Sequence, residues 1–243
     1  MPVSLFNIGL YSLLATLSMI VGGFAATIYR PSDKLTSAAQ HFASGVVLAA
    51  VAKELIPKLG ANQPLPALII GFCFGIFSML VLKLFANKLT EKETEQTGVS
   101  PGLVTTVGID LFIDGVLIGI AFLAGTQSGL LIAIALALEI LFLGVSTTAA
   151  LGNRAVSIKL RLLIIILLAL LIPLGSITGA GLLSQLPPAV TEGLLAFGVA
   201  ALLYLVTEEL LVEAHEGSIE TPFITASFFI GFLCILLLEN MTA

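Results

Sequence analysis

Three acidic residues lie inside long apolar stretches of the sequence, where an ionised side chain is costly. Asp110 and Asp114 belong to the stretch GIDLFIDGVLIG, and Glu139 belongs to ALALEILFLG. Because Asp110 and Asp114 are four residues apart, they share one face of a helix. A carboxylate at the centre of a bilayer costs about 2.5–3.5 kcal/mol on insertion scales, and such residues generally serve a function. These three acids are therefore the candidate site.

The chemistry that suits this group is cation binding. Two ionised acids on one face repel each other strongly in a low dielectric unless a cation bridges them or one of them holds a proton. A divalent cation resolves this repulsion, because three carboxylates can neutralise it and coordinate it through oxygen. Neutral acids that hydrogen-bond a neighbouring helix are the structural alternative. We predict that Asp110, Asp114 and Glu139 bind a divalent metal ion as a substrate, with no cofactor.

Five further residues are candidates for accessory ligands along a pathway. Each is a histidine or a glutamate near the end of an apolar stretch, where an interfacial or solvated side chain is the simpler interpretation. For the segment VEAHEG, which contains Glu213 and His215, a solvated helix end is that simpler interpretation. The five candidates are His41, Glu54, Glu208, Glu209 and His215.

The elements that must position these residues are membrane-spanning helices. The chain has 243 residues, of which 58% are hydrophobic and 10% are charged, whereas a soluble domain carries roughly 25% charged residues. The mean hydropathy is +1.14. In lipid, each apolar run of ~20 residues has to be helical so that its backbone polar groups are paired internally. We predict a single all-α domain over 1–243, with eight helices over 4–29, 35–58, 65–88, 99–124, 130–151, 158–184, 188–213 and 220–240.

The basic residues predict an orientation. Eight of them fall on one side of the membrane if the helices alternate in direction, and only Lys53 and Lys58 fall towards the other. The eight are Arg30, Lys34, Lys83, Lys88, Lys92, Arg154, Lys159 and Arg161. The positive-inside rule then places both termini outside the cytoplasm. We expect a multi-pass protein of the plasma or inner membrane, with the N-terminal apolar run as its first span and not a cleaved signal.

A weak internal repeat accompanies this pattern. The segment GVVLAAVAKELIP begins at Gly45, and GVAALLYLVTEELLVE begins at Gly198. Since the second and seventh helices run in opposite directions, the repeat is inverted, with Glu54 near the outer face and Glu208 near the inner face. Inverted repeats that flank a midplane site are a recurrent build of secondary transporters. We predict that helices 1–3 and 6–8 form the two repeats around helices 4 and 5.

Other classes of protein fit the sequence poorly. There is no basic patch with aromatic residues for nucleic acid. An aspartyl membrane protease needs aspartates on facing helices, and the zinc and serine motifs HExxH and GxSG are absent, so we expect no enzyme. Cys73 and Cys234 lie in apolar runs and are expected to be buried, inert thiols. Pro173 predicts a kink in the sixth helix, and faces rich in small residues allow a homodimer.

Across essentially its whole length, the chain resembles the ZIP family of divalent-metal transporters. That family has eight helices, both termini outside and a metal centre between helices 4 and 5. Its helix 4 motif is of the type His-Asn-x-x-Glu-Gly, and DLFIDG is similar to it, with Asp110 on the histidine and Asp114 on the glutamate. The helix 5 motif is of the type His-x-x-x-Glu-Gly. Alignment on Gly144 places Glu139 on its histidine and Leu143 on its glutamate.

The departures from the family motifs bear on the metal. Acids replace both histidines and leucine replaces the helix 5 glutamate, so the resemblance implies one reduced, carboxylate-rich site. Oxygen-only ligation favours harder cations such as Mn²⁺, Mg²⁺ or Fe²⁺ over the zinc usual for the family. The expected function is transport of Zn²⁺, Mn²⁺ or Fe²⁺ across the lipid bilayer into the cytoplasm. A proton-coupled transporter of a small organic solute that uses the same acids is the alternative.

Overall fold

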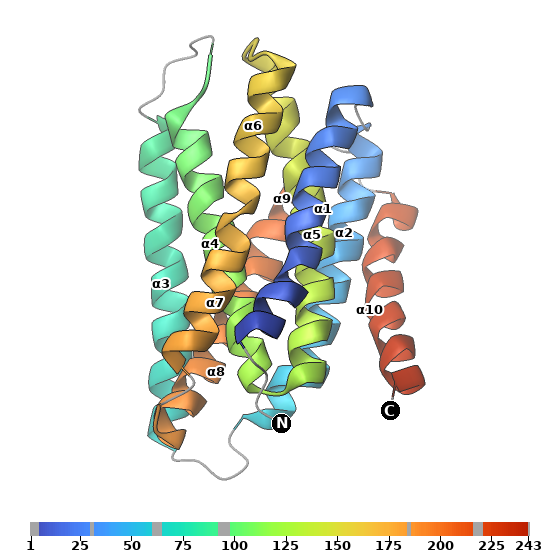
Figure 1. The fold of residues 1–243 in the computed structure, drawn as a ribbon. Coiled ribbons are helices and arrows are strands. Elements are labelled where there is room, and N and C mark those ends of the chain that lie inside the picture. Colours follow the sequence, from blue (N-terminus) through green and yellow to red (C-terminus); the bar gives the residue numbers. More distant parts are fainter. Residues whose placement is uncertain are drawn as a thin grey trace.

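The chain folds into a bundle of helices. The computed structural model describes residues 5–29, 32–59, 65–91, 98–183, 186–215 and 221–242, and every regular element in these ranges is helical (Figure 1). The α-helices are α1 (Leu5–Ile28), α2 (Asp33–Ala50), α3 (Leu65–Glu91), α4 (Pro101–Leu123), α5 (Thr126–Asn153), α6 (Ile158–Ala169), α7 (Leu171–Leu183), α8 (Pro188–Tyr204), α9 (Leu211–His215) and α10 (Pro222–Thr242). Three short turns, η1 (Val51–Leu55), η2 (Ile56–Lys58) and η3 (Leu205–Leu210), continue α2 and join α8 to α9. The result is eight rods at the eight predicted positions.

Seven of these rods are long and apolar enough to cross a membrane, and in α10 the apolar stretch is the shorter Pro222–Leu238. Their outward faces carry large apolar side chains; on α3, for example, Phe74 and Phe77 are 60% and 62% exposed. A water-facing bundle would not expose such side chains over its whole length. A multi-pass membrane protein, as predicted, fits both observations.

The prediction of buried cysteines is wrong. Cys73 on α3 and Cys234 on α10 are both exposed on the surface of the bundle. In a membrane protein an apolar run does not distinguish the face that meets lipid from the face that meets protein, because both surroundings are apolar. Burial of a single residue in such a run therefore depends on how its helix is rotated.

Local sequence explains where several helices begin and bend. Ser100 caps α4, and its Oγ accepts a hydrogen bond of 3.0 Å from the backbone N–H of Leu103. The predicted kink at Pro173 is confirmed, since α6 ends at Ala169 and α7 begins at Leu171. Proline has no N–H to donate, and its ring clashes with the carbonyl group four residues earlier.

The helices pack in four close pairs, α1 with α5, α4 with α7, α2 with α10, and α3 with α8. Glycine allows the close approach in these pairs. A Cβ atom on Gly22 of α1 would lie 2.0 Å from the carbonyl oxygen of Leu141 on α5, and one on Gly45 of α2 would lie 1.9 Å from that of Phe228 on α10. Gly71 and Gly115 make equivalent contacts in the other two pairs. At these positions the in-helix glycines thus serve close helix packing.

The close pairs assemble into two groups. The first group holds α1, α4, α5, α6 and α7, and the second holds α2, α3, α8, α9 and α10. An apolar groove of about 580 Å³ runs along one seam between them, with Phe74 and Phe197 on the second group and Phe112 and Val116 on the first.

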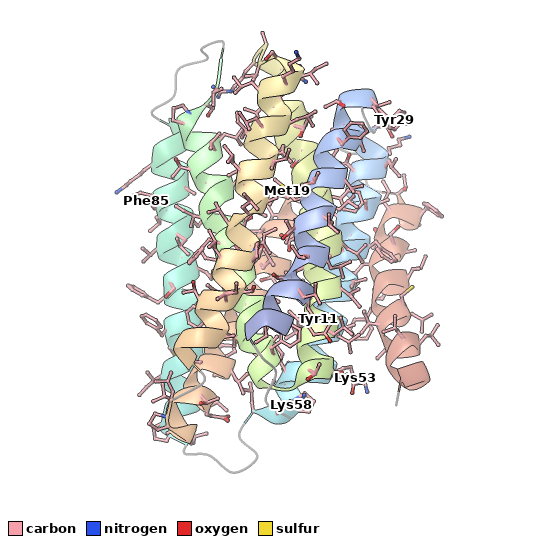
Figure 2. All side chains as sticks on the ribbon, in the orientation of Figure 1. Tyr11, Met19, Tyr29, Lys53, Lys58 and Phe85 are labelled. Carbon is pink, nitrogen blue, oxygen red and sulfur yellow. The ribbon has the colours of Figure 1, made fainter. Side chains whose placement is uncertain are left out.

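The two ends of the bundle differ in charge. Helix α1 begins and α10 ends at the same end, which we name the terminal end (Figure 1). Lys53 and Lys58 lie there, whereas Tyr29 lies at the opposite end (Figure 2). The opposite end, where α1 ends and α2 begins, carries Lys34, Lys88, Arg154 and Lys159, and we name it the basic end.

Candidate metal centre

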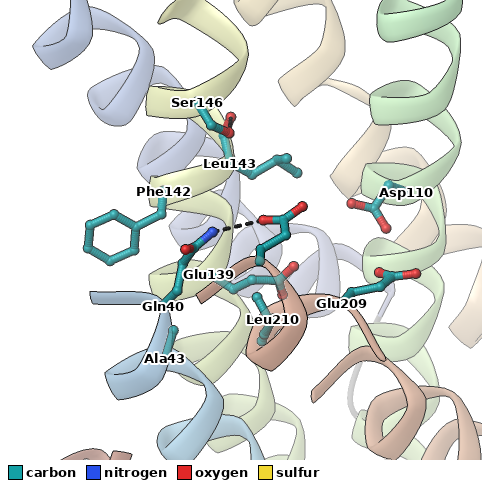
Figure 3. Close-up of a pocket in the computed structure, with 10 residues that line it drawn as sticks. Gln40, Ala43, Asp110, Glu139, Phe142, Leu143, Ser146, Glu209 and Leu210 are labelled. Carbon is teal, nitrogen blue, oxygen red and sulfur yellow. Dashed lines mark hydrogen bonds between the residues drawn. The ribbon is translucent and has the colours of Figure 1, made fainter. Parts of the chain in front are cut away.

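Asp110, Asp114 and Glu139 meet between α4 and α5. Each offers a carboxylate oxygen, and the three oxygens all lie within 4.8 Å of one another. The connection from Leu123 to Thr126 is so short that α4 and α5 are antiparallel neighbours, which brings residues near the middle of each helix to the same depth. Figure 3 shows Asp110 and Glu139 extending into the space between these helices. The predicted cluster of three acids is confirmed as a juxtaposition.

Two of these acids are almost completely buried. Asp114 is 1% exposed and Glu139 is 5% exposed. Asp114 Oδ2 and Glu139 Oε2 have no hydrogen-bond partner among the described residues. An unpaired buried polar atom is rare because it forfeits the hydrogen bonds it would make in water. Such oxygen atoms are satisfied when they bind a cation or carry protons.

A cavity of about 40 Å³, which we name the carboxylate cavity, adjoins this cluster (Figure 3). Its polar lining is Gln40, Asp110, Glu139, Ser146, Glu209 and Glu213. Gln40 Nε2 donates a hydrogen bond of 2.8 Å to Glu213 Oε2. Glu209 therefore lies beside the cluster, as expected of an accessory residue. Glu213 is exposed near the end of α9, as expected of a solvated helix end, and it also lines this cavity.

A larger space, which we name the vestibule, leads from the cluster towards the basic end. It encloses about 530 Å³ and shares Asp110, Ser146, Glu209 and Glu213 with the carboxylate cavity. It extends to Ala86 near the end of α3 and to Ala150 near the end of α5. The cluster is thus connected to the basic end of the bundle through a space partly lined by acids.

Glu208 lies in the vestibule and is paired with a lysine. Lys83 Nζ is 3.3 Å from Glu208 Oε2 and 5.7 Å from the centre of the Tyr204 ring. Glu208 is half-exposed and does not belong to the three-acid cluster. Lys83 was expected only as an interfacial positive charge, and the structure places it against a predicted pathway residue.

Towards the terminal end, the cluster is closed off by apolar side chains. Leu117 and Ile118 on α4 and Ile132 and Leu136 on α5 are all 2% exposed or less. Close packing of this kind leaves few voids as large as a water molecule. In the part of the chain that the structure describes, the cluster therefore opens towards the basic end, and buried apolar side chains separate it from the terminal end.

Glu54 lies beyond this apolar layer, at the terminal end. Ser128 Oγ donates a hydrogen bond of 2.6 Å to Glu54 Oε2, and Lys58 Nζ lies 3.7 Å from the same oxygen. Lys58 also donates a hydrogen bond to Ser128. This network ties the end of the second rod to the start of α5. Glu54 is thus a partner in an inter-helix contact and lines neither the carboxylate cavity nor the vestibule.

His41 and His215 lie outside the cluster but next to each other, with ring centroids 4.9 Å apart. Sequence reasoning overlooked Gln40, Ser146 and Glu213 as lining residues. One signal was available: Glu209 and Glu213 are four residues apart, the same spacing as Asp110 and Asp114.

Neither models of known protein families nor curated proteins match this chain. The chemistry of the site therefore has to be argued from its own residues.

Proposed function

We propose that this chain transports divalent metal cations across a membrane. In this proposal, Asp110, Asp114 and Glu139 bind the cation midway across the bilayer. The observation that carries the proposal is the buried oxygen cluster, in which Asp114 Oδ2 and Glu139 Oε2 lack partners among the described residues. Three ionised carboxylates in one apolar place need a positive partner, and a divalent cation is the partner that all three can coordinate at once.

The ligand set favours hard or borderline cations. Mn²⁺ and Fe²⁺ accept all-oxygen surroundings, and Zn²⁺ also binds carboxylate oxygen at about 2.0–2.2 Å. A small organic solute, the alternative substrate, would need a pocket of about 300–1,000 Å³. The carboxylate cavity, at about 40 Å³, has room for an ion and not for such a solute, whereas the adjoining vestibule, at about 530 Å³, is large enough for one.

Two observations support an inverted repeat. In an inverted repeat, each helix of one half corresponds to a helix of the other: α1 to α6–α7, α2 to α8–α9, α3 to α10, and α4 to α5. If corresponding helices are exchanged, the α1–α5 pair becomes the α7–α4 pair. The same exchange converts the α2–α10 pair into the α8–α3 pair, so all four close pairs obey it. In addition, the two repeated segments both contain a π-helical turn, η1 with Glu54 and η3 with Glu208. π-Helical turns are rare in proteins, and those that occur often lie at functional sites.

These features also support membership of the ZIP family, with its metal centre between the fourth and fifth spanning helices. In this proposal the metal enters from the terminal end past Glu54, and rocking of one helix group against the other opens the way into the vestibule. The apolar groove along the seam between the groups supports such a motion, because a loosely filled seam resists sliding less than a close-packed one. Glu208 and Glu209 then line the way out to the cytoplasm.

The test is metal binding by purified protein, measured by thermal shift and titration calorimetry over Mn²⁺, Zn²⁺, Fe²⁺, Co²⁺ and Cd²⁺. At a metal concentration of 100 times Kd the native state gains about 2.7 kcal/mol, so the melting temperature rises. Asp114→Asn should abolish the rise with Mn²⁺, whereas Asp33→Asn, the same change at the start of α2, should leave it intact. An equal rise in Asp114→Asn, or no rise with any metal, would refute the proposed site.

A further inference from the structure

The two histidines of the chain meet although they lie near opposite ends of the sequence. His41 is on α2, His215 is on α9, and their ring centroids are 4.9 Å apart with the ring planes inclined at 54°. His41 is buried, at 2% exposed, and His215 is exposed. The pair therefore joins a buried position in the bundle to its surface at the basic end.

Hydrogen bonding orients both rings in the same way. His41 Nδ1 lies 2.9 Å from the carbonyl oxygen of Ser37, and His215 Nδ1 is bonded to the carbonyl oxygen of Leu211. A carbonyl oxygen only accepts, so each Nδ1 carries the hydrogen and each neutral ring keeps its lone pair on Nε2. Histidines that bind metal usually donate their other ring N–H in this way, which fixes the tautomer and the ring orientation.

The spacing of the rings suits a shared metal ion. Two imidazoles that bind one tetrahedral Zn²⁺ through bonds of about 2.0–2.1 Å have ring centroids about 5 Å apart. The observed separation of 4.9 Å is close to this value, and the inclination of 54° is not that of a parallel stack.

The pair lies on the same two helices as two residues that line the carboxylate cavity. Gln40 precedes His41, Glu213 lies two residues before His215, and both line the carboxylate cavity. The hydrogen bond from Gln40 to Glu213 holds α2 against α9, and so does one from Ser37 Oγ to the carbonyl oxygen of Ala214. These two hydrogen bonds hold together the two helices that carry the histidines, and so they fix the histidine pair in place.

We propose that His41 and His215 form a second cation site, in which the two Nε2 atoms bind the ion and water completes its coordination. Imidazole ligands suit Zn²⁺, Co²⁺, Ni²⁺ and Cu²⁺, whereas Mg²⁺ and Mn²⁺ prefer oxygen. The site therefore takes nitrogen-preferring divalent cations and rejects the harder ones that the carboxylate cluster accepts. Metal binding at this site does not depend on the proposed function, whereas its place on a transport path rests on it.

The experiment compares Zn²⁺ and Mn²⁺ binding to protein purified without a polyhistidine tag. The wild-type chain should bind two Zn²⁺ ions and one Mn²⁺ ion. His215→Ala, which alters an exposed side chain, should lose one of the two Zn²⁺ ions and keep the Mn²⁺ ion. Thr207→Ala, an exposed change in the preceding turn, should behave as wild type. Thermal unfolding without metal shows whether each variant is folded.

Cu²⁺ electron paramagnetic resonance in the Asp114→Asn background identifies the ligands directly. The spectrum should show coupling to two imidazole nitrogens, reduced to one by His215→Ala. Unchanged Zn²⁺ stoichiometry in His215→Ala, or a spectrum without nitrogen coupling, would overturn the inference and leave the carboxylate site untouched. Loss of Zn²⁺ in His215→Ala together with unaltered Mn²⁺ binding in Asp114→Asn would instead retain the histidine site and refute the proposed function.

Discussion

At the candidate metal centre all three candidate ligands are carboxylates, and Asp110 is the least buried of them. Asp114 and Glu139 are almost fully buried, whereas Asp110 is half-buried and faces both the carboxylate cavity and the vestibule. Under the proposed membership of the ZIP family, Asp110 takes the place of a histidine. The identity of this one side chain therefore sets how hard the ligand set is.

Asp110→His should shift the preference of the centre from Mn²⁺ towards Zn²⁺. The change replaces one of three oxygen ligands with nitrogen, which zinc accepts more readily than manganese does. We expect the ratio of the two dissociation constants to change on the order of tenfold, equivalent to about 1.4 kcal/mol. Competition titration measures the ratio. Asp110→Glu, which keeps oxygen, is the control, and an unchanged ratio in Asp110→His would show that Asp110 does not ligate the ion.

The residues of the centre differ in how far they could be predicted. Asp110 and Asp114 are readable from their spacing of four, and Glu139 from the short connection that makes α4 and α5 neighbours. Gln40 and Glu213 could not be placed in this way, because they reach the cavity only through the packing of α2 and α9 against the central helices.

Among the elements, the close helix pairs depend on glycine for their geometry. On α1, Gly22 faces the backbone of α5, where an added Cβ would lie 2.0 Å from the Leu141 carbonyl oxygen. Gly9 on the same helix has more space, since among the described residues its added Cβ would meet only the side chain of Ile177, at 3.4 Å. Substitution of each glycine by alanine therefore measures how much the close backbone contact at Gly22 contributes to stability, with Gly9 as the control.

Gly22→Ala should destabilise the protein by about 1–3 kcal/mol, the usual cost of overpacking. The two backbones would have to separate, which would disturb packing along the whole α1–α5 pair. Gly9→Ala should be close to neutral, because helix propensity favours alanine by about 1 kcal/mol and the neighbouring side chain can shift. Unfolding in detergent by heat or denaturant measures the difference. Equal stability of the two variants would contradict the packing of α1 on α5.

The π-helical turns η1 and η3 were not predicted. Apolar periodicity finds the two long rods, but the insertion of a π-turn leaves composition unchanged and shifts only the phase of the residues beyond it. In both rods the turn contains acidic residues: Glu54 in η1, and Glu208 and Glu209 in η3. Helical spacing across these turns is therefore an unsafe guide to which side chains share a face.

For the molecule as a whole, the main property is that, among the described residues, the three-acid cluster is open towards one end of the bundle. The vestibule reaches the basic end, and apolar packing around Leu117 and Leu136 closes the route to the terminal end. The excess of Lys and Arg at the basic end predicts that this end is cytoplasmic. Under that orientation, the structure is in the state that would release an imported ion.

A cysteine at Ser146, which lines the vestibule, should react with a membrane-impermeant thiol reagent from the cytoplasmic side only. The background for this test replaces the exposed Cys73 and Cys234 with serine. Gln127→Cys, at the other end of α5, should react only from outside. Labelling of intact cells and of inverted vesicles distinguishes the sides. The reverse pattern would invert the orientation, and labelling of both positions from one side would rule out α5 as a spanning helix.

The sequence by itself determined that the chain crosses a membrane, where its eight helices lie, and which acids are costly enough to need a partner. These properties depend on composition and on near neighbours along the chain, and so they survive without knowledge of the packing. The tertiary structure alone decided that the cysteines face outward, that Glu213 lines the carboxylate cavity, and that His41 meets His215. In an apolar solvent every face of a helix has similar composition, so only the contacts between helices determine which side chains come together.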